Sequence, residues 1–173
     1  KVTSIEKNAF SGCYALQTVT LPKGLASLGQ NAFSGCCALQ TITLPKGLAS
    51  MEQGVFSECC ALESIVIPQG ITKLKANMFY NCNALTSVTL PNTMKYIEQY
   101  AFAYCEQLSD LVLPESLSWI GEEAFICCNS LQTIKIPEEV IVIGKYAFHY
   151  CSSLESVDLP AGLRTLGSGA FEG

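Results

Sequence analysis

The chain has 173 residues, of which 49% are hydrophobic and 14% are charged, and its formal net charge is −5. This composition excludes a disordered chain, and the excess of acidic residues argues against nucleic acid as a partner. No apolar run approaches the roughly 18 residues of a membrane-spanning helix, so we expect no direct membrane insertion, and no signal peptide is visible.

A fixed repeat organises the whole chain. All 8 phenylalanines stand 23 residues apart, and all 7 prolines keep the same interval. Such a period is typical of a solenoid, in which each repeat is one coil and equal residues lie on top of each other. We therefore expect interior columns of identical side chains. These structural columns comprise Phe10, Phe33, Phe56, Phe79, Phe102, Phe125 and Phe148, with Cys36, Cys59, Cys82, Cys105 and Cys128.

Each repeat contains the same predicted elements in the same order. Polar and apolar residues alternate over positions such as 18–21, which predicts a strand with one buried face. The proline that follows ends the strand, because it cannot donate to a sheet. After a turn, an apolar pair such as Leu25 and Leu28 predicts a second short strand. The segment 31–36 carries Ala-Phe and Cys at helical spacing, which predicts a short helical or 3₁₀ turn.

One motif recurs in these repeats. In one of them it is formed by Leu131 to Pro137, followed by Val140, Ile143, Gly144, Ala147, Phe148 and Cys151. This motif resembles the BspA-type, or Treponema-type, leucine-rich repeat, and the resemblance covers the whole chain. It implies a leucine-rich-repeat solenoid of about seven and a half coils, mainly β with short helical or 3₁₀ turns and a parallel sheet on the concave face. It also implies a non-enzymatic adhesion module, at the cell surface or secreted, that binds a protein or glycan.

The ten cysteines favour packing over bridging. Seven of them form one column, and Cys37, Cys60 and Cys127 lie beside it. Column members in stacked coils lie about 5 Å apart between Cα atoms, but their side chains run parallel rather than facing each other. We interpret them as reduced, buried thiols. Because the chain has no Cys-x-x-Cys pair and a single histidine, we expect no metal ion and no cofactor.

Outward strand positions form the first candidate binding surface. These residues are Thr18, Thr20, Thr41, Thr43, Thr89, Asp110, Lys135 and Asp158. Repeat proteins commonly bind partners on a concave sheet, although threonine also favours exposed strand sites without any binding role.

Aromatic and acidic residues in the second half form another candidate surface. The aromatic members are Tyr96, Tyr100, Trp119 and Tyr146, and we expect Tyr96 and Trp119 to stack. Such residues anchor interfaces, but they also cover coil edges. From Glu98 to Asp158 there are ten acids and two bases, which favours a basic partner.

No set of residues predicts catalysis, because His149 has no marked nucleophile and orienting acid beside it. We expect residues 1–173 to form a single leucine-rich-repeat domain, and the partial repeats at both ends indicate a fragment of a longer protein. The alternative to a binding module is a structural spacer or a filament-forming scaffold that self-associates end to end.

Overall fold

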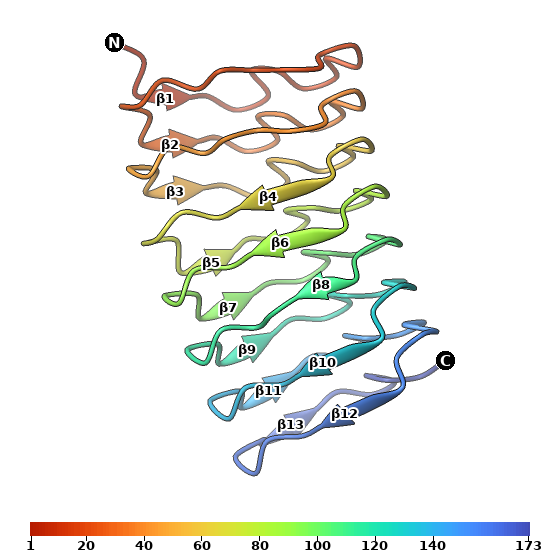
Figure 1. Ribbon diagram of the computed structural model, residues 1–173. Helices are drawn as coiled ribbons and strands as arrows, with labels where there is room; N and C mark the ends of the chain where they lie inside the picture. Colours follow the sequence, from red (N-terminus) through yellow and green to blue (C-terminus); the bar gives the residue numbers. More distant parts are fainter.

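Thirteen short strands, all paired in parallel, form two walls of a β-solenoid in the computed structural model, which describes residues 1–173 (Figure 1). The solenoid has about seven turns of a 23-residue repeat, as the sequence predicted. Each coil runs from one proline to the next, so coil 1 contains Phe10, coil 2 contains Phe33 and coil 3 contains Phe56.

In the front sheet face a strand precedes five of the seven prolines; the strand predicted over residues 18–21 is absent, and coil 2 forms only an isolated bridge. The strands of this face are β4 (Ser64–Val66), β6 (Ser87–Thr89), β8 (Asp110–Leu111), β10 (Thr133–Lys135) and β12 (Ser156–Asp158). The back sheet face contains the second predicted strand of each repeat. Its strands are β1 (Ser4–Ile5), β2 (Ser27–Leu28), β3 (Ser50–Met51), β5 (Lys73–Leu74), β7 (Tyr96–Ile97), β9 (Trp119–Ile120), β11 (Val142–Ile143) and β13 (Thr165–Leu166).

Strand register follows the repeat without a shift. Ser64 pairs with Ser87 between β4 and β6, and Tyr96 pairs with Trp119 between β7 and β9. Neither face is one continuous sheet, however. The front strands group as β4-β6-β8 and β10-β12, and the back strands as β1-β2-β3 and β5-β7-β9-β11-β13. The coils therefore stack in register, but their backbone pairing is interrupted at particular steps.

The third wall, which carries the phenylalanines, differs from the sequence prediction. The expected helical or 3₁₀ turn is absent, because the residues two positions before and two positions after each phenylalanine have positive φ, as do Asn31 (54°) and Gly35 (73°) around Phe33. A left-handed residue ends a right-handed helix. This backbone directs amide groups along the solenoid: the N–H groups of Asn31, Phe33 and Gly35 donate to the carbonyls of Gln53, Val55 and Ser57 in the next coil, at 3.0, 2.9 and 2.8 Å.

The core is one column of apolar side chains that runs through the coils. It contains 45 buried residues, and the rings from Phe33 to Phe125 have no exposed surface. Adjacent phenylalanine rings stack with centroids 4.9–5.9 Å apart. Phe10 is partly buried, because only the ring of Phe33 stacks on it. Each buried large side chain contributes about 1.5–3 kcal/mol, so these columns are the main source of stability.

Candidate binding surfaces

The front sheet face carries the outward strand residues that the sequence singled out. All eight are exposed: Thr18, Thr20, Thr41, Thr43, Thr89, Asp110, Lys135 and Asp158. The structure does not gather them into one site. Thr41, Thr43 and Thr89 line a common hollow, whereas the other five lie on coils outside it.

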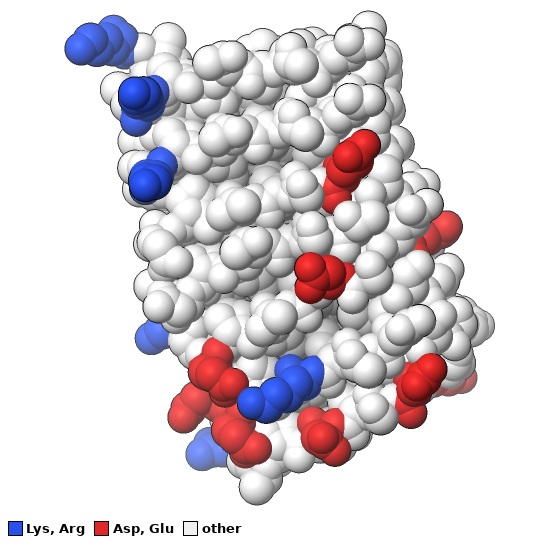
Figure 2. Space-filling model, in the orientation of Figure 1, with Lys and Arg blue, Asp and Glu red and all other residues white.

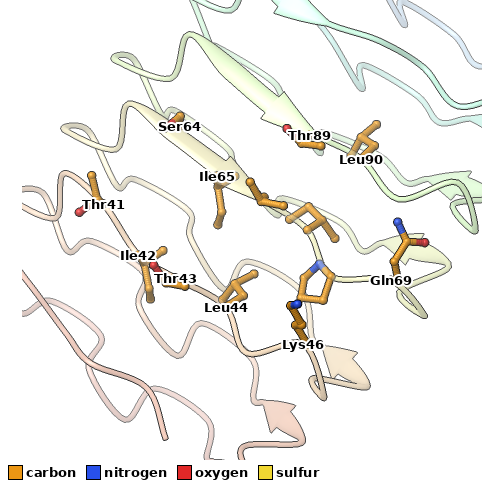
Figure 3. Close-up of a pocket in the computed structure, with 13 residues that line it drawn as sticks. Thr41, Ile42, Thr43, Leu44, Lys46, Ser64, Ile65, Gln69, Thr89 and Leu90 are labelled. Carbon is orange, nitrogen blue, oxygen red and sulfur yellow. The ribbon is translucent and has the colours of Figure 1, made fainter. Parts of the chain in front are cut away.

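The hollow lies between coils 2, 3 and 4 and has a volume of about 640 Å³. Figure 3 shows Ile42 to Leu44 on one side, Ile65 of β4 in the middle and Thr89 of β6 on the far side. Val66, which completes the lining on β4, is 63% exposed. The hollow is thus a mixed surface of small hydroxyl groups and aliphatic side chains, which suits contact with another protein.

The hollow forms where backbone pairing stops. Coil 2 meets β4 only through a bridge between Thr41 and Ser64, whereas β4 and β6 pair over three residues. Apart from that bridge, Ile42, Thr43 and Leu44 make no backbone hydrogen bond within the protein. A segment of exposed sheet without pairing therefore lies beside the exposed Val66, and the sequence contains no signal for this interruption.

Charge is distributed unevenly along the front of the molecule (Figure 2). Basic side chains lie at one edge of the N-terminal coils, acidic side chains gather at the same edge of the C-terminal coils, and the strands β4 and β6 themselves contain no charged residue. The residue that follows each proline changes along the stack, from Lys23 and Lys46 in the N-terminal coils to Glu115 and Glu138 in the C-terminal coils. Lys135, one of the candidate residues, pairs with Glu115 at 3.1 Å.

The aromatic candidates Tyr96 and Trp119 lie on strands of the back sheet face. They are register partners in β7 and β9, as the repeat predicted. The two rings do not stack on each other as expected. Instead the Tyr96 ring makes a cation–π contact with the ammonium of Lys73, which lies 4.8 Å from the ring centre. Trp119 is 45% exposed, and both aromatic side chains line a second hollow of about 480 Å³.

Tyr100 and Tyr146, the other two aromatic candidates, lie on the third wall. Both have positive φ, 58° and 55°, at a position where coils 1 to 4 have asparagine or glycine. The Tyr100 hydroxyl donates to the Glu123 carboxylate at 3.2 Å, and the Lys145 ammonium lies 5.0 Å from the centre of the Tyr146 ring. Desolvation and the bond to Glu123 raise the pKa of Tyr100. The four aromatic candidates are therefore divided between two surfaces.

The buried cysteine column has a role that sequence reasoning missed. The thiols of six column members donate to phenylalanine carbonyls of the preceding coil, with Sγ–O distances of 3.0–3.3 Å. These members are Cys36, Cys59, Cys82, Cys105, Cys128 and Cys151. All ten cysteines are free, as the sequence predicted, but Cys13 is exposed. Burial raises the pKa of Cys36 to about 11 and that of Cys151 to about 12.

No three His, Cys, Asp or Glu side chains come close enough together to hold a metal ion. The single histidine, His149, packs its ring between those of Tyr146 and Tyr150, and its Nδ1 lies 2.9 Å from the Glu172 carbonyl oxygen. The structure contains no helix with the length and hydrophobicity needed to cross a bilayer.

The sequence of these repeats matches the model of a known protein family. The profile described as "BspA type Leucine rich repeat region" matches residues 1–93 and 72–173, in 6 copies. The chain belongs to the BspA-type leucine-rich repeat family. No curated protein sequence matches this BspA-type chain.

Solved structures share this BspA-type fold. A leucine rich cell surface protein from Faecalibacterium prausnitzii is 28% identical, with a TM-score of 0.75, over 98% of this chain and 55% of that protein. The T. pallidum Leucine Rich Repeat protein is 30% identical, with a TM-score of 0.66, over 98% of this chain and 69% of that protein. A leucine-rich repeat protein from Eubacterium ventriosum is 23% identical, with a TM-score of 0.76, over 99% of this chain and 43% of that protein, and shares the fold. The chain thus spans about half the length of the F. prausnitzii protein.

Proposed function

We propose that this chain is a non-enzymatic interaction module of a cell-surface or secreted protein, and that it binds a protein partner through the hollow on the front sheet face. The observation that carries the proposal is the unpaired backbone of Ile42–Leu44 beside the exposed side chain of Val66. Free N–H and C=O groups next to an apolar contact give a partner both hydrogen bonds and buried area.

Two further facts support this role. The strands β4 and β6 contain no charged residue, and Lys46 is the one charged residue that lines the hollow, so most of the surface that a partner would cover is uncharged. The F. prausnitzii relative is named as a cell surface protein, and a location outside the cell suits a module that meets extracellular partners. Repeat solenoids present extended surfaces of this kind for recognition.

The test begins with arrays of purified extracellular proteins and of glycans, probed with the labelled chain. The strongest hit is then measured by surface plasmon resonance against the chain and against Val66→Asp, which places a charge in the hollow. We expect Val66→Asp to weaken binding at least about tenfold, because the carboxylate must lose its water at the interface.

Thr72→Asp is the matched control, since Thr72 is exposed on the back of coil 4 and outside the hollow. It should leave affinity unchanged within about twofold. Equal losses in the two variants would overturn the assignment to the front face, and a loss on Trp119→Ala alone would move binding to the back. A hit on glycans only would replace the protein partner, and fibres without any hit would favour the structural scaffold.

A further inference from the structure

Two thiols on the surface of neighbouring coils are in contact. Cys37 of coil 2 and Cys60 of coil 3 occupy the same position in successive repeats, four residues after Phe33 and Phe56. Their sulfur atoms are 3.8 Å apart, and the Cys60 S–H is placed to donate to the Cys37 sulfur. The carbonyl oxygen of Glu58 is an alternative acceptor for both, at 3.5 and 3.4 Å.

Pairing requires a partly exposed thiol and a second sulfur that faces it, and each of the other cysteines lacks at least one of these. Members of the buried column direct their thiols to phenylalanine carbonyls, as Cys59 does to Phe33 at 3.3 Å, so a bridge would break these bonds. Burial also raises the pKa of Cys59, which leaves little of the reactive thiolate at neutral pH. Cys127 is partly exposed, but its thiol makes no hydrogen-bond contact with another sulfur. Only Cys37 and Cys60 combine partial exposure with a facing sulfur.

We propose that Cys37 and Cys60 form a redox-reactive dithiol, which closes to an inter-coil disulfide when the protein meets a low-molecular-weight disulfide. The site is a place of covalent modification on the surface of the solenoid. It is independent of the hollow, because its chemistry needs only the two facing thiols and the oxidant.

The reaction proceeds in two thiol–disulfide exchanges. The Cys37 thiolate attacks one sulfur of the oxidant, the oxidant's S–S bond breaks, and one small thiolate leaves and takes up the proton that Cys37 lost. The Cys60 thiolate then attacks the Cys37 sulfur, and the second small thiolate leaves and takes up the proton of Cys60. The two protein thiols are oxidised, and one oxidant disulfide is reduced to two thiols.

Closure needs little movement of the backbone. Coils 2 and 3 stack at the spacing of paired parallel strands, which lies within the Cα separations that disulfides tolerate. The two sulfur atoms must approach from 3.8 Å to a bond length of about 2 Å, which rotation of the side chains supplies. On the front face coils 2 and 3 meet only through the bridge between Thr41 and Ser64, so the new bond would add a covalent link between two coils that pair little on that face.

The experiment uses the whole chain, reduced and then incubated with oxidised glutathione. Free thiols are blocked with N-ethylmaleimide, and intact mass and peptide mapping locate the bridge. We expect two fewer blocked thiols, a peptide that joins Cys37 to Cys60, and a melting temperature raised by about 5–10 °C relative to the reduced protein. Dithiothreitol should reverse all three changes. Closure should also be faster at alkaline pH, because desolvation and the Cys37 thiol raise the pKa of Cys60.

Cys127→Ser is the matched control, since it removes a partly exposed thiol that has no facing sulfur, and it should leave the bridge intact. Cys37→Ser and Cys60→Ser should each abolish the bridge and leave the remaining thiol joined to glutathione. Circular dichroism checks that both variants fold. The proposal would be overturned by separate glutathione adducts on Cys37 and Cys60 without a joined peptide, by a bridge through Cys36 or Cys59, or by two thiols that stay reduced.

Discussion

The thiol of Cys82 donates a hydrogen bond to the carbonyl oxygen of Phe56 in the preceding coil, with the two atoms 3.0 Å apart. The same oxygen accepts the N–H of Cys59, at 3.2 Å, from within its own coil. Both lone pairs of this buried carbonyl are therefore satisfied, which an apolar side chain at position 82 would prevent. Cysteine suits this column because its thiol is small enough to bury and still donates a hydrogen bond.

Cys82→Ala should lower the free energy of unfolding by about 1–2 kcal/mol, because it removes this donor and leaves a small cavity. Urea unfolding followed by circular dichroism measures the change. Cys127→Ala, at a partly exposed thiol, should stay within about 0.5 kcal/mol of the parent. Cys82→Val restores volume without a donor, so full recovery of stability in this variant would contradict a contribution from the S–H bond.

Stability should fall at alkaline pH. Burial raises the pKa of Cys36 from 9.0 to about 11 and that of Cys151 to about 12, so the folded state holds protons that the unfolded chain releases. This contribution is fully present below pH 9.0 and is lost as the pH rises through the folded value of about 11 for Cys36. Urea unfolding under reducing conditions between these limits provides the measurement.

Cys36→Val provides the control for this pH dependence, since it removes one titrating thiol. It should make the loss of stability shallower by up to about 1.4 kcal/mol per pH unit within this window. Parallel pH profiles for the parent and the variant would show that Cys36 does not contribute.

Gly144→Ala should destabilise the protein by about 1–3 kcal/mol, because the coils approach too closely for a side chain there. A Cβ atom at Gly144 would lie 2.5 Å from the backbone nitrogen of Glu122. Gly47→Ala is the matched control, since a Cβ at Gly47 would meet no atom within 4 Å. Thermal unfolding compares the two, and a control variant as unstable as Gly144→Ala would mean that close approach is not the cause.

Phe79→Ala should cost about 3–5 kcal/mol, because the ring is fully buried and stacks between Phe56 and Phe102 at centroid distances of 5.8 and 5.4 Å. Thr43→Ala, on the exposed face, should change stability by less than about 0.5 kcal/mol. Equilibrium urea unfolding tests both variants. Similar, small effects would disprove the phenylalanine column as the main support of the solenoid.

The repeat alone was sufficient to predict the coil and its columns, because equal spacing in the chain becomes equal height in a stack. The helical turn predicted around Phe33 is wrong. The spacing of Ala32, Phe33 and Cys36 suits a helix, but the asparagine and glycine on either side of Phe33 favour a left-handed backbone. Asn31 and Gly35 are residue types that tolerate positive φ, and asparagine or glycine occupies seven of the eight equivalent positions in the first four repeats, the exception being Glu58. Those residues were the available evidence that the backbone turns left-handed there.

The candidate site was only partly accessible to sequence reasoning. Thr41, Thr43 and Thr89 are exposed as expected, yet nothing in their identity shows that pairing fails between coil 2 and β4. Cys37 and Cys60 carried a readable signal, because thiols one repeat apart on the surface lie side by side in a stack. The interpretation of all ten cysteines as buried packing thiols does not use this signal, because it treats Cys37 and Cys60 like the members of the buried column.

Period and residue type determined the solenoid, its register and which side chains fill the interior, because these depend on repetition along the chain. Tertiary structure alone decided where the sheet opens into a hollow and which sulfur atoms face each other. Both depend on how closely neighbouring coils approach at each step, which is decided by packing between side chains of several coils rather than by the repeat itself.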